Sequence, residues 1–427
     1  MMLKTDSASS STPRLFVLED LSRALVTAKN YGGLVALLLL DLDRFGLVNC
    51  CLGDAIGDEL LAMVARRIDR SLEPKELVLR AGGDQFAILL PGADAAHALA
   101  LADGLLKTLE GPFVVDGREL YAPAAVGIAL YPATAETATE LRQQAEVALY
   151  LAKRDQGART VLFEPAMAQD LQQRFAMELD LRGALERGEF FLQYQPTVDL
   201  QSSSIIGVEA LLRWRHPQRG VVAPMEFIPL AEETGLINSI GRWVLRTACN
   251  QVSQWEVENG GRRLNLNVNL SAVQLVGPHL ADEVDRALTE SGLSPSQLVL
   301  ELTESALLHG TPRVLRTLGV LKALGVRLAV DDFGTGYASL TYLRRFPVDI
   351  LKIDKSFVDA VQPGSREFAL VHSIMDIALA LELETCAEGI ERADQLSELQ
   401  GLRCHQGQGY YFARPLDPSG VEALLRQ

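Results

Sequence analysis

The stretch that decides the fold of the second half of the chain is RLAVDDFGTGY, Arg327 to Tyr337. An apolar run of strand length ends there in two adjacent carboxylates, Asp331 and Asp332, and a loop with two glycines follows. Adjacent carboxylates repel each other, so they are seldom placed together without a cation. At the C-terminal end of a strand in an α/β barrel, such residues take part in chemistry. Alone, the pair could also begin a solvated loop, so the rest of the chain must decide.

Length and charge narrow the possible functions. The chain has 427 residues, of which 48% are hydrophobic and 22% charged, as expected for a globular protein of two or three domains. Its formal net charge is −15. Proteins that bind duplex nucleic acid are more often basic, so we expect no DNA partner. A small anionic ligand is still compatible with an acidic protein when metal ions bridge the two.

The N-terminus and the cysteines favour a cytoplasmic protein. Residues 1–13 (MMLKTDSASSSTP) lack the apolar core of a signal peptide and are expected to form a disordered tail. The longest apolar run, Leu34 to Leu40, is too short to span a bilayer, so we expect no membrane span. The five cysteines show no metal-ligand spacing, and their odd number suggests reduced thiols.

Strand and helix patterns alternate between residues 14 and 165. Apolar runs at 34–42 and 122–130 predict strands, and two short runs around Gly-Gly-Asp at 82–84 predict a β-hairpin. Helical spacing of apolar residues recurs at 58–71, 95–109 and 140–153. This alternation predicts a compact α/β domain with one central sheet. Residues 166–188 have the pattern of an amphipathic helical linker. That helix could transmit a signal, or it could simply be the first helix packed on the next domain.

Four motifs of this first domain resemble the GGDEF domain of diguanylate cyclases, which join two GTP molecules into cyclic di-GMP. The motifs are DLDRF (41–45), GDAIGDELL (53–61), RAGGDQF (80–86) and ALYLAK (148–153). The resemblance implies a metal at Asp41 and Asp84, guanine contacts from Asn49 and Asp58, and a phosphate contact from Lys153.

Departures from the family pattern predict a domain without cyclase activity. Gln85 stands where the family has a glutamate, and Gly46 stands where it has a lysine near the phosphates. Loss of both weakens metal and triphosphate binding. Other motif positions also differ: they are occupied by Cys50 and Asp54, and by Glu73 and Glu76 where the inhibitory Arg-x-x-Asp site would be. The domain could still bind GTP as a regulator, or serve as a dimerising scaffold.

Eight strand-like runs between residues 189 and 427 end in polar residues, and helical segments such as 229–257 separate most of them. The runs are FFLQYQP (190–196), IIGVEALLRW (205–214), LNLNVNLS (264–271), LVLELTES (298–305), RLAVDD (327–332), ILKID (350–354), ETCAEGIE (384–391) and QGYYFARP (408–415). The count and length predict a (β/α)8 (TIM-like) barrel, in which one strand could be reversed or displaced. The predicted fold class of the chain is therefore α/β throughout.

In such a barrel the polar residues at the strand ends would meet at one mouth. They are Glu209, Asn269, Glu301, Asp331, Asp332, Lys352, Glu388 and Gln408. Five carboxylates in one pocket cannot all stay ionised without cations. Oxygen ligands suit Mg²⁺ or Mn²⁺, and two such ions are the usual device for in-line phosphodiester cleavage. Singly, each residue has an ordinary alternative, since Asn269 could cap a helix and Lys352 could be a solvated rim residue.

Residues Phe175 to Leu416 resemble the EAL family of cyclic di-GMP phosphodiesterases. The motifs, in the family's order, are EALLR (209–213), NLS (269–271), ELTE (301–304), DDFGTGYASL (331–340), LKIDKSF (351–357), AEGIE (387–391) and QGYYFARP (408–415). By this resemblance the metal ligands are Glu209, Asn269, Glu301, Asp331, Asp332 and Glu388. The catalytic residues are Lys352, Glu388 and Asp332, with Lys352 positioning and activating the attacking water.

The resemblance also implies a substrate site and a regulatory loop. Arg213 corresponds to a substrate-phosphate contact, for which a planar guanidinium is well suited, and Gln408 and Glu391 support the site. The regulatory loop beside the second metal runs from Phe333 to Leu340, is anchored by Glu304, and contains Gly334, Thr335 and Gly336. Its glycines permit backbone conformations that other residues rarely adopt. Family members also imply a homodimer through the EAL domain.

We therefore expect a cytoplasmic, metal-dependent phosphodiesterase that opens cyclic di-GMP to linear pGpG, with a regulatory and possibly GTP-binding first domain. The alternative is a cyclic di-GMP receptor that binds without hydrolysis. No identified catalytic position is substituted, which favours the enzyme. A bifunctional enzyme is a third possibility, and Gln85 and Gly46 count against it.

Overall fold

The chain divides into two compact units, with the boundary between Ala176 and Met177 inside one long helix. The computed structural model describes residues 12–31, 33–154, 158–304, 306, 312–334, 343, 345–361 and 366–426. Each unit has a hydrophobic core of its own. None of the helices in these ranges combines the length and apolar character needed to cross a bilayer.

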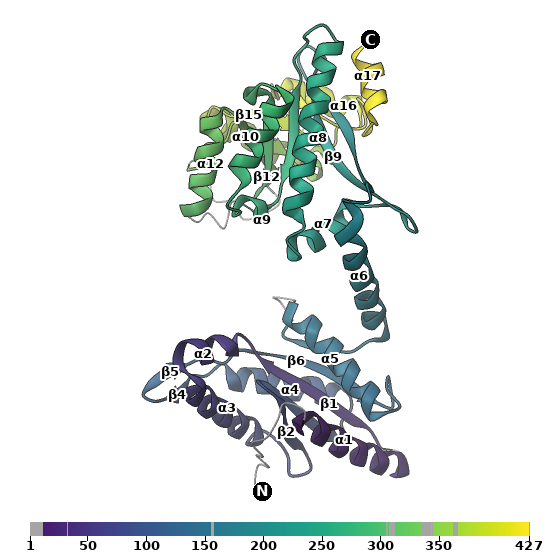
Figure 1. Cartoon of the computed structure of the whole chain (residues 1–427), viewed down its shortest axis with the longest axis vertical. Helices are drawn as coiled ribbons and strands as arrows, with labels where there is room; N and C mark the ends of the chain where they lie inside the picture. The colour runs from purple at the N-terminus through teal and green to yellow at the C-terminus, as the bar shows by residue number, and fades with distance from the viewer. Residues whose placement is uncertain are drawn as a thin grey trace. The chain divides into compact units, whose positions relative to one another are not determined.

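The first unit contains a five-stranded sheet in the order β2-β3-β1-β6-β7, together with a small β4–β5 hairpin. Its elements are α1 (Thr12–Tyr31), β1 (Val35–Leu42), α2 (Phe45–Leu52), α3 (Asp54–Asp69), β2 (Leu77–Gly82), β3 (Gln85–Pro91), α4 (Ala95–Leu109), β4 (Phe113–Val115), β5 (Arg118–Leu120), β6 (Ala124–Tyr131), α5 (Ala138–Arg154), β7 (Thr160–Leu162) and α6 (Pro165–Ala184). Helix α6 carries the chain into the second unit (Figure 1).

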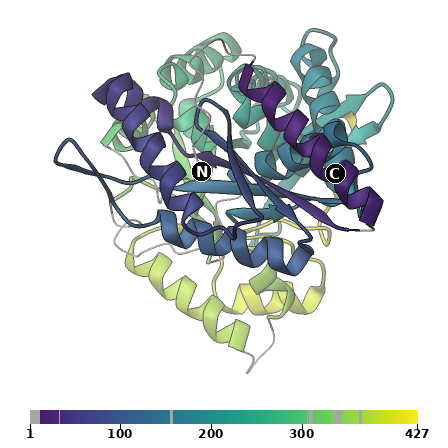
Figure 2. The same ribbon diagram turned by 90° about the horizontal axis from the view of Figure 1, so that it is seen from below.

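Helices cover both faces of this sheet, which explains why β1 is a continuous apolar run. Alternate β1 side chains point to opposite faces. Leu38 and Leu40 pack in one core with residues of α3 and α4, whereas Leu37 and Leu39 pack in another with residues of α1 and α5. Figure 2 shows the helices on either side of the strands. The α/β domain with one central sheet and a β2–β3 hairpin is therefore confirmed.

The start of the chain differs from expectation. Helix α1 was not predicted, and it includes Thr12 and Pro13, which were assigned to the disordered tail. Residues 1–11 of that tail lie outside the described residues. The helix is held by tertiary packing rather than by a strong pattern of its own, because Leu21 and Leu25 are buried against the sheet.

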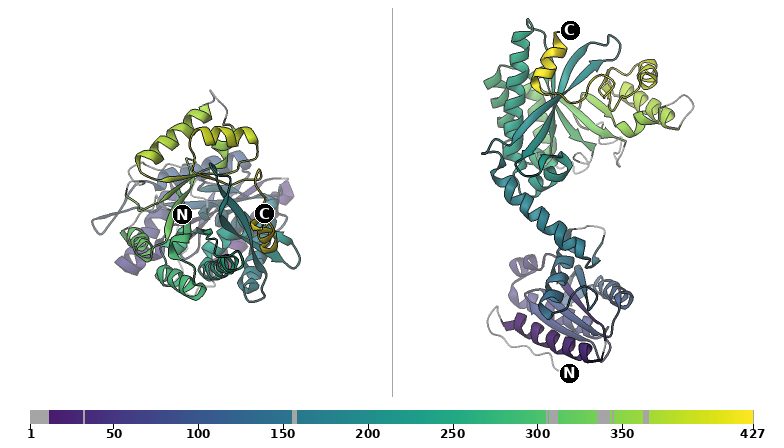
Figure 3. Two further views of the ribbon diagram at one scale, coloured as in Figure 1. Left: turned by 90° about the horizontal axis from the view of Figure 1, so that it is seen from above. Right: turned by 90° about the vertical axis from the view of Figure 1, so that its right-hand side faces the viewer.

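The second unit is a closed barrel with helices around it, as Figure 3 shows. Its elements are β8 (Phe190–Asp199), β9 (Ile205–His216), β10 (Gly220–Val222), α7 (Pro224–Glu233), α8 (Ile237–Glu258), β11 (Asn265–Leu270), α9 (Ala272–Leu275), α10 (Leu280–Ser291), a 3₁₀ turn (Pro295–Gln297), β12 (Leu298–Thr303), α12 (Pro312–Leu324), β13 (Arg327–Phe333), β14 (Ile350–Ile353), α14 (Lys355–Asp359), α15 (Arg366–Ala380), β15 (Glu384–Ala387), α16 (Ala393–Gly401), β16 (Gln406–Gly407) and α17 (Pro418–Leu425).

Strand β8 is the reversed strand of the barrel. It is antiparallel to both neighbours, β9 and β16, whereas β9 and β11 to β16 are parallel to one another. Strand β10 only extends β9 as a hairpin at the rim. The eight-stranded α/β barrel is thus confirmed. The sequence allowed one strand to be reversed or displaced, and the structure shows that the first strand, β8, is reversed.

Two local features differ from the sequence prediction. The helix expected at 229–257 is two helices, α7 and α8, because Gly235 between them has a left-handed backbone with φ 74°. The strand predicted at QGYYFARP (408–415) is wrong in position, because the eighth barrel strand, β16, is the two residues just before it, Gln406–Gly407. Neither difference moves the C-terminal ends of the parallel strands, where the predicted site residues lie.

Candidate active site

Lys352 on β14 lies at the centre of the polar residues that the strands bring together. Its side chain is 1% exposed. Its Nζ atom lies 2.6 Å from Glu388 Oε1, 2.7 Å from Glu301 Oε2, 3.2 Å from Asp331 Oδ1 and 3.8 Å from Glu209 Oε2. These four carboxylates come from four different strands or strand ends. The predicted convergence therefore occurs, and its centre is an ammonium group.

Amide side chains bridge the carboxylates around this lysine. Gln408 donates from Nε2 to Glu209 Oε2 at 2.7 Å and to Glu388 Oε1 at 3.2 Å. Asn269 donates from Nδ2 to the other Glu209 oxygen at 2.6 Å. The predicted residues Asn269 and Gln408 thus both fix the orientation of Glu209. Neither residue caps a helix in this arrangement; Gln408 is buried, whereas Asn269 is exposed at the mouth of the barrel.

Asn267 belongs to the same network and was missed by sequence reasoning. It is buried and donates from Nδ2 to Glu301 Oε1 at 2.7 Å. The signal was present in the sequence, because asparagines alternate in LNLNVNL and Asn265, Asn267 and Asn269 share one face of β11. That face is the barrel interior, since the intervening leucines and valine lie in the core with the outer helices.

An apolar layer lies beneath the charged residues inside the barrel. It is formed by Val299, Ala329, Ile350 and Cys386. Glu301 and Lys352 lie two residues beyond Val299 and Ile350 on the same strands, so they occupy the next layer toward the C-terminal ends. This layer excludes water from below and accounts for the strong desolvation of the site.

The site holds more carboxylates than cations, and the pKa values of its residues are shifted accordingly. Burial, followed by the Glu209 charge, raises the pKa of Glu301 well above its ordinary value. Burial also raises the pKa of Glu388 to about 8, although Lys352 opposes that shift. Burial alone would lower the pKa of Lys352, but the surrounding carboxylates together raise it. The lysine therefore stays an ammonium, and its single positive charge is shared by four carboxylates.

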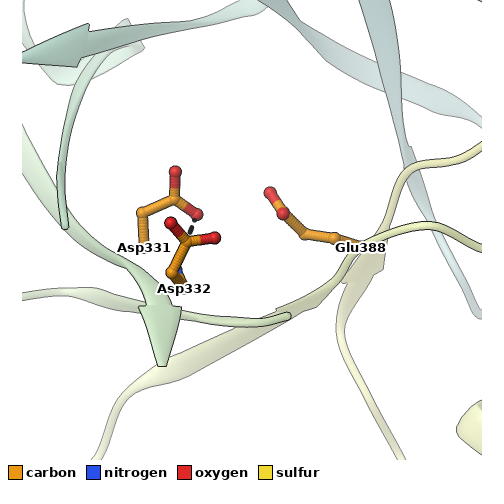
Figure 4. Close-up of side chains that lie close together, drawn as sticks. All are labelled: Asp331, Asp332 and Glu388. Atoms are coloured by element: carbon orange, nitrogen blue, oxygen red, sulfur yellow. Dashed lines mark hydrogen bonds between the residues drawn. The ribbon is translucent and has the colours of Figure 1, made fainter. Parts of the chain in front are cut away.

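Three of these carboxylates lie together at the mouth of the site, two on β13 and one just after β15. The carboxylates of Asp331, Asp332 and Glu388 each place an oxygen within 4.8 Å of the others, and Figure 4 shows them converging. Burial and the Asp331 charge raise the pKa of Asp332. Two adjacent residues of β13 and one residue after β15 thus supply carboxylate oxygens that a divalent cation can bridge.

The residues fit divalent cations. With all five carboxylates ionised, these groups and the one ammonium would carry a net charge of −4, which two divalent ions would balance. Two buried oxygens, Glu301 Oε2 and Gln408 Oε1, have no hydrogen-bond donor. Glu301 Oε2 is close to Lys352 Nζ, but the pair is not aligned for a hydrogen bond. Oxygen donors of this kind suit Mg²⁺ or Mn²⁺.

The backbone turns sharply after Asp331. Asp332 has φ 54°, in the left-handed region, and its N–H donates to Asp331 Oδ1 at 3.0 Å. Gly334 has φ 98°, and its N–H donates to the buried Glu304 Oε2 at 2.9 Å. A Cβ at Gly334 would lie 2.8 Å from the Phe357 ring. Glu304 therefore holds the start of the predicted regulatory loop, while Thr335 and Gly336 lie outside the described residues.

Two residues predicted to serve the substrate site, Arg213 and Glu391, make polar contacts outside the Lys352 cluster. The half-buried Arg213 donates from Nε to Gln193 Oε1 at 3.0 Å and from Nη1 to the Leu212 carbonyl at 2.9 Å. Gln193, on the reversed strand β8, was not predicted and fixes the plane of the guanidinium. The exposed Glu391 pairs with Lys355 at 2.5 Å, so the structure does not bring it into the Lys352 cluster.

In the first unit, the structure brings together part of the predicted nucleotide site. Asp41 accepts hydrogen bonds from Lys153 and from Gln85, and the Asp41 charge acts on Asp84. The other two predicted residues lie on neighbouring helices. Asn49 on α2 has a buried Oδ1 atom against Gly57, and Asp58 on α3 lies 3.9 Å from Arg80.

Comparison with known proteins agrees with this geometry. The family model described as EAL domain matches residues 178–415, and the one described as diguanylate cyclase, GGDEF domain, matches residues 4–159. The bifunctional diguanylate cyclase/cyclic di-GMP phosphodiesterase MucR of Pseudomonas aeruginosa is 41% identical over 95% of this chain. The cyclic di-GMP phosphodiesterase NbdA of the same organism is 37% identical over 100% of this chain. This chain spans 59% of MucR and 54% of NbdA, so it corresponds to only part of each.

A solved structure titled "PaMucR Phosphodiesterase, c-di-GMP complex" is similar over 58% of this chain and 99% of its own, with 44% identity and a TM-score of 0.55. The residues that the EAL family model matches, 178–415, include every strand that contributes to the Lys352 cluster. The chain therefore belongs to the EAL domain family and carries a GGDEF domain in tandem before its EAL barrel.

Proposed function

We propose that the barrel is a metal-dependent phosphodiesterase that opens cyclic di-GMP to linear pGpG. The observation that carries the proposal is the group of five carboxylates at the mouth of the barrel: four lie within 3.8 Å of the buried Lys352 Nζ, and Asp332 lies beside two of those four. Relatives named as cyclic di-GMP phosphodiesterases, and one solved with cyclic di-GMP, support the substrate. The intact acidic set favours turnover over the alternative of a receptor that only binds.

Two divalent ions would be held by six residues: Glu209, Asn269, Glu301, Asp331, Asp332 and Glu388. When bound, such ions polarise phosphoryl oxygens and lower the pKa of water. Lys352 remains an ammonium because its carboxylate neighbours raise its pKa. It can therefore donate a hydrogen bond to the attacking water and orient it, but it cannot take the proton from that water.

The reaction is an in-line displacement at one phosphate. The water oxygen bonds to phosphorus, its proton passes to a carboxylate oxygen of Asp332 or Glu388, and the bond from phosphorus to O3′ breaks. O3′ takes up a proton, so the product carries one free 5′-phosphate and one free 3′-hydroxyl, as in pGpG. Arg213, with its plane fixed by Gln193, contacts a phosphate oxygen, and Gln408 keeps Glu209 oriented.

The loop that begins at Phe333 is proposed to regulate the site. Its first described residues connect Asp332 to Glu304 through the Gly334 N–H, so a displacement of the loop would move a carboxylate of the acidic group. We also propose the first domain as a regulatory module without cyclase activity. GTP binding by that domain, a homodimer through the EAL domain and a cytoplasmic location stay predictions.

Hydrolysis of cyclic di-GMP by the purified full chain tests the proposal. We expect pGpG in the presence of Mg²⁺ or Mn²⁺, none in EDTA, and loss of turnover in Glu209→Gln, which keeps the size of the side chain. Glu290→Gln, at an exposed position of α10, is the matched control and should retain turnover.

The outcomes separate the two candidate functions. Tight binding of cyclic di-GMP without turnover in either metal would assign the protein to the receptor class. Adding GTP to the same assay tests regulation by the first domain, and formation of cyclic di-GMP from GTP would contradict the absence of cyclase activity.

A further inference from the structure

A second charged group lies in the first unit, where the end of β1 meets the β2–β3 hairpin and the end of α5. The Asp41 carboxylate is 5% exposed, and both of its oxygens accept hydrogen bonds. Oδ1 accepts from Lys153 Nζ, and Oδ2 accepts from Gln85 Nε2 at 2.8 Å. These partners are 112 and 44 residues away in sequence, so only the tertiary structure joins them.

The orientation of the Gln85 amide follows from the chemistry of its partner. An ionised carboxylate can only accept hydrogen bonds, so the amide must turn its NH₂ group toward Asp41 rather than its oxygen. A glutamate at position 85 would instead place a second carboxylate against Asp41. Two carboxylates in contact need a cation between them. Gln85 therefore removes the demand for a divalent ion and supplies a donor in its place.

The remaining acids near Asp41 do not complete a metal site. Burial, together with the Asp41 charge, raises the pKa of Asp84, so this pair is already short of positive charge. Asp43, the other carboxylate at the end of β1, is paired with Arg159. Over the part of the chain that the structure describes, groups of three or more potential metal-ligating side chains are found only in the barrel. Because Gln85 and Lys153 already occupy both Asp41 oxygens, the residues at Asp41 do not fit a divalent ion in this arrangement.

We propose that Lys153 is the resident cation of the GGDEF domain, kept at Asp41 by Gln85, and that the Asp41 site binds no divalent metal ion. The replacement of the family's glutamate by Gln85 then does more than remove one metal ligand. Its metal position is filled by an ammonium group that arrives from α5, and a divalent ion would have to displace that group and turn the Gln85 amide away. An anion that enters this domain meets Lys153 instead of a metal ion.

Counting bound Mn²⁺ on the full chain tests this proposal, because the electron paramagnetic resonance signal of free Mn²⁺ disappears on binding. We compare the wild type with Asp41→Asn and Gln85→Glu. The wild type and Asp41→Asn are expected to bind the same number of ions, and Gln85→Glu is expected to bind one more. Asp331→Asn, in the barrel, is the control that should bind fewer. Differences between variants of the first domain do not depend on whether the barrel hydrolyses cyclic di-GMP.

Two results would overturn the proposal. A wild type that binds one more Mn²⁺ than Asp41→Asn would show that Asp41 holds a metal despite Lys153. A Gln85→Glu variant that folds, as judged by circular dichroism, but gains no ion would remove the role assigned to Gln85. If Gln85→Glu fails to fold, the comparison with Asp41→Asn still decides, because asparagine keeps the size of the aspartate side chain.

Discussion

Replacing Lys352 by methionine should destabilise the metal-free barrel by about 3–5 kcal/mol at pH 8, the usual cost of removing one partner of a buried ion pair. Methionine reaches the position of the lysine Cε atom and lacks the charged Nζ group. In the wild type the ammonium lies between 2.6 and 3.8 Å from four carboxylates. Its loss leaves these groups without a counter-ion in a layer closed from below by apolar side chains.

The size of this effect should depend on pH and on metal. Protons can replace the ammonium, and burial raises the pKa of Glu388 to about 8, so the cost should be smaller at pH 6 than at pH 8. Divalent cations can replace it too. At a concentration 100 times the dissociation constant, a bound ion stabilises the folded state by about 2.7 kcal/mol, so Mg²⁺ should recover much of the loss.

Urea unfolding in EDTA, followed by tryptophan fluorescence, measures this effect in the intact chain. The protein has three tryptophans, Trp214, Trp243 and Trp255, and all lie in the barrel unit, so the signal reports on that unit. Lys355→Met is the matched control, because Lys355 pairs with Glu391 at exposed positions, where solvent screens the attraction. The control should change the urea midpoint far less than Lys352→Met.

The reasoning would be refuted if Lys352→Met and Lys355→Met had the same urea midpoint at pH 8 without metal. That result would mean that the carboxylates are not held together by the lysine, or that they are already protonated at this pH. A midpoint that falls equally at pH 6 and pH 8 would refute the electrostatic part alone and leave a packing effect.

Three further changes test other parts of the site. The wild-type metal-free barrel should lose stability as the pH rises from about 4.5 to about 8, because the folded state keeps on Glu388 a proton that the unfolded chain has released; constant urea midpoints across that window would contradict this. Gln193→Leu should raise KM for cyclic di-GMP about tenfold with little change in kcat, since a hydrogen bond to a charged group is worth about 1.5 kcal/mol. The same substitution should have no further effect on KM in an Arg213→Ala background. Additive effects of the two substitutions would count against a positioning role for Gln193. Gly334→Ala should destabilise the barrel by about 1–3 kcal/mol through its left-handed backbone and a Cβ placed 2.8 Å from a phenylalanine ring, whereas Gly319→Ala, which meets no atom within 4 Å, should not.

Local patterns in the sequence predicted much of the site, because strands place their last residues at known positions. A strand-length apolar run followed by acids predicted Asp331 and Asp332. Glu209 and Glu301 were expected at strand ends too, but they lie inside β9 and β12, which continue to His216 and Thr303. The parallel ladder brings such ends to one side of a sheet regardless of the chain between them. The sequence also carried the alternation that marks the α/β domain before the barrel.

Contacts between residues distant in sequence could not be predicted in this way. The direction of β8 depends on its pairing with both β9 and β16, and no periodicity within β8 encodes that choice. The helix α1 forms because it covers a face of the first sheet, so it left no strong pattern of its own.

By itself, the sequence determined which strands carry carboxylates in or just after them, and therefore that this barrel concentrates negative charge at its mouth. Only the tertiary structure decided how that charge is shared. It places Lys352 between four carboxylates in the barrel and Lys153 against Asp41 in the first domain, because each ammonium is delivered by an element far along the chain. The physical reason is that side-chain type is local, whereas burial and ion pairing depend on which distant elements pack together.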